Sequence, residues 1–277
     1  MNFDIETLLA LGGLLLVAGA AVGFLAGLFG VGGGAVSVPV LYEAFGFMGI
    51  DDGVRMPLAV GTSLALIVPT SLQSARSHYL RGAMDLHVLR QWAVPILIGV
   101  SVGSVVARYA DPWVFKLVFI GVAGLVSVRM LRGSGWNVAD ALPGKGLMSV
   151  FGMIIGFLSS LMGIGGGAIS NLILSLFGTP IHRAVATSAG VGVLISIPGA
   201  IGYIYAGWGK AGLPPDALGY VSILGFLLLL PTSFLTTRFG VQAAHALKKR
   251  QLEVLFGLFL MTVCLRFIYD MFFAGAS

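Results

Sequence analysis

Charged residues are scarce in this sequence. Only 10% of its 277 residues are Asp, Glu, Lys or Arg, whereas 57% are hydrophobic, and the mean hydropathy is +0.99. A soluble domain carries about 25% charged residues, so this chain has too few of them to surround a core with a polar surface. Apolar stretches of about 20 residues, which suffice for one membrane span, recur along the chain. The sequence therefore predicts a single integral membrane domain over residues 1–277, embedded in the lipid bilayer.

Cysteine is nearly absent as well. The single Cys264 excludes an intrachain disulfide and a cysteine metal cluster, and we expect it to pack as a small apolar residue. The four histidines are scattered along the chain, so we expect no metal site and no cofactor. No Lys or Arg precedes Arg55. Because a secretory signal needs a basic start, we expect the first apolar stretch to be retained.

The apolar segments divide the chain into two halves of the same plan. In the first half they cover 8–29, 35–49, 58–75, 87–107 and 113–131, and in the second 147–162, 168–177, 184–206, 217–237 and 251–273. The stretch GFLAGLFGVGGGAVS (Gly23–Ser37) matches GFLSSLMGIGGGAIS (Gly156–Ser170). Further on, AVGTSLAL (Ala59–Leu66) matches AVATSAGV (Ala184–Val191). The sequence thus predicts an all-α membrane protein with internal repeats at about 8–131 and 147–273, each a glycine-broken helical hairpin followed by three transmembrane helices.

The 16 basic residues indicate how these helices are oriented. If each glycine-broken segment leaves the membrane on the side where it entered, 11 basic residues lie on one side and 5 on the other, whereas a single crossing gives 8 and 8. Because Lys and Arg mark cytoplasmic loops, the uneven division is favoured, and it explains the net charge of +5 without a nucleic-acid partner. Both termini then lie on the non-cytoplasmic side, and the halves are inverted repeats, a known plan of transporters.

The distribution of basic residues does not decide whether each glycine hairpin is re-entrant or crosses the membrane twice. A re-entrant hairpin and a pair of full crossings both return the chain to the side where it started. The ten residues of 168–177 span about 15 Å as a helix, which is about half of the hydrocarbon core. Length therefore favours re-entrant hairpins that meet near the midplane, although 8–29 is long enough to cross alone.

Each half contains a glycine run that interrupts a helix deep in the bilayer. Unpaired backbone groups are costly there, so the break must be buried in protein or line a polar cavity. Half-helices that begin near Ala35 and Ala168 direct their free N–H groups and the positive end of the helix dipole toward the break. Such an end binds an anion without a basic side chain. Close helix packing through small residues is the alternative role of these glycines.

The candidate binding residues lie at the two breaks or at the start of the helix that follows. Ser37, Ser170 and Asn171 fall in the first turn of the half-helices, where helix capping is their alternative role. Thr62–Ser63 and Thr187–Ser188 can donate to an anion or bond back to a carbonyl one turn earlier. The predicted substrate-binding residues are Gly30, Gly32, Gly33, Gly34, Ser37, Thr62, Ser63, Gly163, Gly165, Gly166, Gly167, Ser170, Asn171, Thr187 and Ser188.

Two arginines are expected to act as electrostatic gates at the mouths of this site. Arg55 lies seven residues before Thr62, and Arg183 lies four before Thr187. At about 100° per residue, each arginine falls near the face of its threonine. Snorkelling toward the membrane interface is the alternative role of both.

No Asp or Glu is expected in the middle of a helix. Proton and sodium sites of transporters usually include such a group, so the sequence indicates an anion carrier without an evident coupling ion. Two other classes stay open. A membrane-embedded enzyme would need a catalytic carboxylate, a histidine pair or a metal site, and none is found; an assembly subunit would transport nothing itself. The acidic residues weighed for these roles lie at helix ends or in loops: Glu43, Asp85, Asp111, Asp140 and Asp216.

Several motifs resemble the repeated motif of the TauE/SafE sulfite exporter family. They are GLFGVGGGAVSVPVL, LAVGTSLA, GIGGGAISNLIL, HRAVATSAGVG and the run LPPDALGYVSILGFLLLLPTSFLTTRFG, and the resemblance covers about residues 22–260. It implies a multi-pass permease of the bacterial inner membrane whose substrate is sulfite or a small organosulfonate such as sulfoacetate. Another small organic or inorganic anion is the alternative, because one fold serves many substrates. The sequence is compatible with a homo-oligomer but does not require one.

The resemblance assigns substrate binding to the two glycine runs and to both Thr-Ser pairs. The repeats differ in detail, since Gly61 stands where the second repeat has Ala186. Any two-fold symmetry of the site is therefore expected to be approximate.

Overall fold

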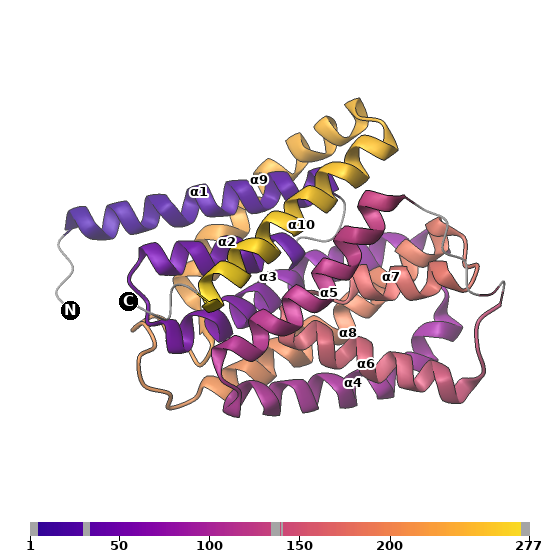
Figure 1. Cartoon of the computed structure of the whole chain (residues 1–277), viewed down its shortest axis with the longest axis horizontal. Coiled ribbons are helices and arrows are strands. Elements are labelled where there is room, and N and C mark those ends of the chain that lie inside the picture. The colour runs from indigo at the N-terminus through magenta and orange to yellow at the C-terminus, as the bar shows by residue number, and fades with distance from the viewer. Residues whose placement is uncertain (1–4, 30–33, 134–138, 140, 273–277) are drawn as a thin grey trace.

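Nearly every described residue of the computed structural model is helical (Figure 1). The structure describes residues 5–29, 34–133, 139 and 141–272. The first half contains α1 (Ile5–Phe29), α2 (Gly34–Phe47), α3 (Asp52–Leu80), α4 (Leu86–Tyr109) and α5 (Pro112–Arg132). The second half contains α6 (Lys145–Met162), α7 (Gly167–Leu176), α8 (Ile181–Gly207), α9 (Ile223–Ala246) and α10 (Lys249–Phe272). Two short strands, β1 (Ala217–Leu218) and β2 (Val221–Ser222), lie between α8 and α9.

Eight helices of the described residues are long and apolar enough to cross a membrane. The two short ones, α2 with 14 residues and α7 with 10, each follow a glycine run. Large apolar side chains such as Val94, Leu97 and Ile98 of α4 are exposed on the outer surface, where hydrocarbon tails can cover them. The expected multi-pass helical membrane protein is thus confirmed. Since α1 and α6 are each long enough to cross alone, only the second arm of each hairpin is short.

The two helices α3 and α8 form the centre of the bundle and run antiparallel. They are the most buried of the eight long helices. Ser71 and Ser196 meet at one level of the interface, and Leu64 packs against Gly199 at another. This interface joins the two halves of the chain.

A second antiparallel pair is formed by α5 and α10. The hydroxyl of Ser127 donates to the carbonyl oxygen of Gly257 across a distance of 2.7 Å. Cys264 of α10 is buried and faces Ile120 of α5, which confirms that it packs as a small residue. The last helix of the first half is therefore paired with the last helix of the second half.

Glycines allow the first helix of each half to pack closely on a helix of the other half. α1 lies parallel to α9 through Gly19, Gly23 and Gly27, and α6 lies parallel to α4 through Gly152 and Gly156. A Cβ atom at any of these positions would press into the partner helix. Small residues commonly permit such close approach in membranes. Helix packing is therefore the role of these five glycines.

The segment before α9 departs from the expected helix. The apolar run 217–237 predicts a helix from residue 217, but the structure forms an antiparallel hairpin there, and α9 begins only at Ile223. Gly219 adopts a left-handed φ of +57°, a conformation that favours glycine and ends a helix. The N–H of Tyr220 then donates to the carbonyl oxygen of Tyr203 on α8 (3.1 Å). The hairpin thus packs against the end of α8.

The helices begin and end at two opposite ends of the bundle (Figure 1). α4, α6, α8 and α10 begin at one end, which we call the basic end. α3, α5 and α9 begin at the other, the terminal end, where the first described turn of α1 and the last of α10 also lie. The loops are thus grouped as in the uneven division of the basic residues, with 11 at the basic end and 5 at the terminal end. Which end faces the cytoplasm stays a prediction from charge.

Candidate functional site

The break between α6 and α7 is a turn built on two left-handed glycines. Gly163 ends α6 with φ +67°, and its N–H donates to the carbonyl oxygen of Ser159; Gly166 precedes α7 with φ +70°. The N–H of Ile164 donates to the same Ser159 oxygen (3.1 Å), and that of Gly166 to Ile164 (2.7 Å). Residues with a Cβ rarely adopt these φ values, and a Cβ at Gly166 would also collide with Ile195. Both glycines are therefore required by the backbone.

The start of α2 lies against this turn. A Cβ at Gly34 would lie 2.8 Å from Cα of Ile164 and 3.1 Å from the carbonyl oxygen of Gly163. A Cβ at Gly163 would lie 2.6 Å from Cγ2 of Val38. The half-helix of the first repeat thus begins beside the turn from which the half-helix of the second repeat begins. The other predicted glycines of the first break lie outside the described residues: Gly30, Gly32 and Gly33.

Two buried serine pairs lie beside the starts of the half-helices. In the first half, the hydroxyl oxygens of Ser37 on α2 and Ser63 on α3 are 2.7 Å apart. In the second half, the hydroxyl oxygens of Ser170 on α7 and Ser188 on α8 are 2.9 Å apart. None of the four is more than 5% exposed. The structure thus brings together predicted residues that occupy corresponding positions in the two repeats.

Both serine pairs end on a carbonyl oxygen of the break. Ser63 donates to the carbonyl oxygen of Gly163 (2.8 Å), and the hydroxyl of Ser170 lies 2.7 Å from the carbonyl oxygen of Gly166. Each hydroxyl has one proton, so when Ser170 donates to Gly166, the proton of Ser188 makes the contact between the two serines. A ligand at this pair therefore competes with acceptors that the hydroxyls already have.

The two predicted threonines connect the halves. The hydroxyl oxygen of Thr62 accepts from the N–H of Ser222, which caps α9, at 2.9 Å. The hydroxyl oxygen of Thr187 accepts from the N–H of Asp85, which caps α4, at 3.0 Å. Both threonines are fully buried. Each therefore binds the capping residue of a helix from the other half.

The start of α7 is open on one side. Among the described residues, no side chain caps this helix at Gly166, and a Cβ at Gly167 would meet no atom within 4 Å. The first N–H groups of any helix lack intrahelical partners, so those of α7 are available here. Gly165 is more restricted, since its Cβ would lie 2.9 Å from Cγ2 of Ile67. Asn171 accepts from Ser175 one turn along α7 (3.4 Å), which is a contact within the helix.

The two predicted gate arginines lie at opposite ends of the bundle (Figure 1), because α3 and α8 begin at opposite ends. The side chain of Arg183 is 60% exposed, and its Nη2 lies 3.4 Å from Oδ2 of Asp85. Arg55 pairs with Asp52 and donates to the hydroxyl of Tyr42 (2.6 Å). Both guanidinium charges thus have a carboxylate partner, and their role as gates stays a prediction.

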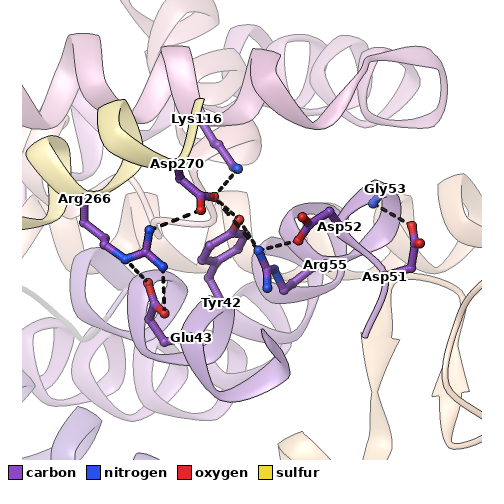
Figure 2. Close-up of polar contacts among 9 residues, drawn as sticks. All are labelled: Tyr42, Glu43, Asp51, Asp52, Gly53, Arg55, Lys116, Arg266 and Asp270. Atoms are coloured by element: carbon purple, nitrogen blue, oxygen red, sulfur yellow. Dashed lines mark hydrogen bonds and ion pairs between the residues drawn. The ribbon is translucent and has the colours of Figure 1, made fainter. Parts of the chain in front are cut away.

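The buried carboxylate of Asp270 is missing from the residues that sequence reasoning selected. It lies in the last turn of α10, 8% exposed, with Nζ of Lys116 at 2.5 Å from Oδ2 (Figure 2). A signal was present in the sequence, because Arg266 and Asp270 stand four residues apart in an otherwise apolar segment. Ionisable residues in membrane segments are commonly functional.

Comparison with known proteins agrees with this architecture. The family model described as sulfite exporter TauE/SafE matches residues 15–267. The chain belongs to the TauE/SafE sulfite exporter family. A probable membrane transporter protein of Haemophilus influenzae is 33% identical over 253 residues, which cover 91% of this chain and 96% of that protein. A probable membrane transporter protein of Methanocaldococcus jannaschii is 32% identical over 266 residues, or 92% and 94% of the two chains.

The names of these TauE/SafE relatives indicate a membrane transporter rather than an enzyme. No solved structure matches the chain.

Proposed function

We propose that this TauE/SafE protein exports a small sulfur-containing oxyanion, sulfite or an organosulfonate such as sulfoacetate, from the cytoplasm. The family description supports a sulfur oxyanion, and the names of the relatives support transport. One observation carries the binding site: α2 begins beside the α6–α7 turn, and α7 starts there without a side-chain cap, next to the buried Ser170–Ser188 pair.

The anion binds at this junction through backbone dipoles and hydroxyl groups. The first N–H groups of α7 point along the helix toward its start and carry partial positive charge, and the open side at Gly167 gives a ligand access to them. The hydroxyl of Ser170, which lies 2.7 Å from the carbonyl oxygen of Gly166, can turn to donate to the anion. Hydrogen bonds to a charged acceptor are about twice as strong as neutral ones. A compact oxyanion is therefore held near the middle of the bilayer without a basic side chain.

The packing of the helices supports two inverted repeats. α3 runs antiparallel to its counterpart α8, and α5 to its counterpart α10. The first helix of each half packs on the fourth helix of the other half, α1 on α9 and α6 on α4. Inverted repeats of this kind expose a central site to one side and then the other by rocking. In this account Thr62 and Thr187 hold the two halves in register.

The membrane potential supplies the driving force. The distribution of Lys and Arg supports an orientation with the terminal end outside the cytoplasm, and the family resemblance supports the bacterial inner membrane. A negative interior then favours exit of a monovalent anion by about 2.3 kcal/mol per 100 mV. Export therefore needs no coupling ion.

Flux from proteoliposomes tests the proposal. Vesicles loaded with sulfite, sulfoacetate or a second organosulfonate are given an inside-negative potential, and release is compared with that from protein-free vesicles. We expect potential-dependent release of at least one sulfur oxyanion. Release of only a carboxylate or phosphate favours the permease for another anion, and failure of every anion in the panel contradicts anion transport.

A further inference from the structure

An ionic cluster with a buried centre and an exposed rim lies at the terminal end of the bundle (Figure 2). Its side chains come from four helices, α2, α3, α5 and α10. They lie near the last turns of α2 and α10 and the first turns of α3 and α5. The members of the ionic cluster are Tyr42, Glu43, Asp52, Arg55, Lys116, Arg266 and Asp270.

Asp270 is at the centre of the ionic cluster. Its carboxylate accepts from Nζ of Lys116 (2.5 Å), from Nη1 of Arg266 (3.1 Å) and from the hydroxyl of Tyr42. Nη2 of Arg55 lies 3.9 Å from the same carboxylate and donates to the Tyr42 hydroxyl (2.6 Å). Tyr42 thus joins α3 to α10, because its hydroxyl accepts from Arg55 of α3 and donates to Asp270 of α10. One carboxylate connects all four helices.

The ionic cluster is balanced in charge, with three basic and three acidic side chains. Lys116 is 9% exposed and Asp270 8% exposed, so their charges are largely removed from water. A buried ion pair gains little stability over a packed apolar pair, whereas removal of one partner leaves an unpaired charge and is strongly unfavourable. The pair therefore adds little net stability while it is intact, but its separation exposes two charges that must find water or other partners.

The helix α2 connects the ionic cluster to the glycine breaks. Tyr42 follows Val38 by four residues and lies on the same face of α2, and Val38 is fully buried. A Cβ at Gly163 would lie 2.6 Å from Val38 Cγ2, so Val38 touches the α6–α7 turn. At the other side, the ring of Tyr42 packs edge-on against Phe267 of α10, with centroids 5.4 Å apart. Tyr42 and Val38 on α2 therefore lie in line between α10 at the terminal end and the α6–α7 turn.

We infer that the ionic cluster is the gate that closes the terminal end of the transporter. In the closed state Asp270 holds Tyr42 and Lys116 together, and α2 stays packed against α10. Opening to this side separates Asp270 from Tyr42 and admits water to Val38. The gate depends on the alternating-access part of the proposed function and not on which anion is carried.

Cysteine accessibility tests the gate without any substrate. The parent protein carries Cys264→Ala and Val38→Cys, and intact cells are treated from outside with a membrane-impermeant maleimide. The gate variants add Asp270→Asn or Tyr42→Phe. The matched control adds Glu253→Gln, which removes a carboxylate of the same helix that pairs with Arg250 (3.6 Å) in the first turn of α10, at the basic end. We expect each gate variant to label about tenfold faster than the parent, because a hydrogen bond to a charged group is lost, and we expect the control to label at the parent's rate.

Several results would overturn the gate. An unchanged labelling rate in both gate variants would contradict it. An equal rise in the labelling rate of Glu253→Gln would also contradict it, since the helices would then be destabilised generally and not at the gate. Faster labelling only from the cytoplasmic side is a third. If Asp270→Asn does not accumulate, Tyr42→Phe decides the question, because it removes one hydroxyl and keeps the ring against Phe267. Labelling and flux are separate measurements, so failure of the anion panel leaves the gate standing, and failure of the gate leaves the flux result standing.

Discussion

The hydroxyl oxygens of Ser71 and Ser196 lie 3.2 Å apart between α3 and α8. The two serines occupy corresponding positions, because Ser71 follows Thr62 by nine residues and Ser196 follows Thr187 by nine. A contact between equivalent positions is what an approximate two-fold axis between the halves requires. This pair is therefore the best place to test the register of the two repeats.

A disulfide between these positions tests that register. In a Cys264→Ala background, the double variant Ser71→Cys and Ser196→Cys should cross-link on mild oxidation, since a disulfide needs Cβ atoms about 3.5–4.5 Å apart. Cleavage at a protease site inserted between α5 and α6, followed by non-reducing electrophoresis, detects the link. The control pair is Ser71→Cys with Ile197→Cys, because Ile197 is exposed on the outer face. Equal cross-linking of both pairs would contradict the register.

The threonine hydroxyls should contribute to stability in both halves. Thr62→Val and Thr187→Val each leave a backbone N–H without its acceptor, at Ser222 and Asp85. An unsatisfied buried group costs about 1–3 kcal/mol, so both variants should unfold at lower temperature in detergent. Thr262→Val is the control, since Thr262 is exposed on α10. Unfolding temperatures equal to that of the control would show that these cross-half bonds do not hold the helices.

The α6–α7 turn should not tolerate a side chain at Gly166. Gly166→Ala places a Cβ at φ +70° and against Ile195, and the left-handed conformation alone costs a non-glycine residue about 1–2 kcal/mol. We expect reduced accumulation and a lower unfolding temperature. Gly144→Ala, where a Cβ would meet no atom within 4 Å, should behave as the parent protein. Normal stability of Gly166→Ala would mean that the turn has a different geometry.

Neutralising Arg183 should affect transport more than stability. Its pair with Asp85 is exposed, and surface pairs contribute about 0–1 kcal/mol, so the unfolding temperature of Arg183→Gln should hardly change. If Arg183 attracts the anion to the mouth at the basic end, the apparent KM should rise while the maximal rate is kept. An unchanged KM would assign Arg183 to the membrane interface instead.

Local patterns were sufficient to predict most of the fold. Glycine runs with φ > 0 and apolar segments of membrane length are properties of neighbouring residues, so the starts of α2 and α7 were expected within one residue, near Ala35 and Ala168, and begin at Gly34 and Gly167. The β1–β2 hairpin was missed because its residues are as apolar as the helix that follows. There the turn at Gly219 and a backbone bond to Tyr203 outweighed hydropathy.

The polar contacts were much less predictable. Ser63 was chosen for its place after the first break, but its bond to Gly163 joins residues 100 positions apart. The pair of Lys116 and Asp270 spans 154 positions. The sequence pattern of a single helix does not predict such partners. They depend on how α3 packs against the α6–α7 turn and how α5 packs against α10. An ionisable residue in an apolar segment predicts that a partner of opposite charge exists, but it does not identify which residue that partner is.

Transport by Gly167→Val measures the central claim most directly. This substitution fills the open space beside the start of α7, where an added Cβ meets no atom of the described residues within 4 Å. The fold should therefore be unaffected while the approach of an anion to the N–H groups is blocked. Gly146→Val, in the first turn of α6 and equally unobstructed, is the control. With an unfolding temperature equal to that of the control, Gly167→Val should export the sulfur oxyanion at least about tenfold more slowly, as expected for losing a hydrogen bond to a charged group. Export at the control's rate would contradict anion binding by the backbone at the start of α7.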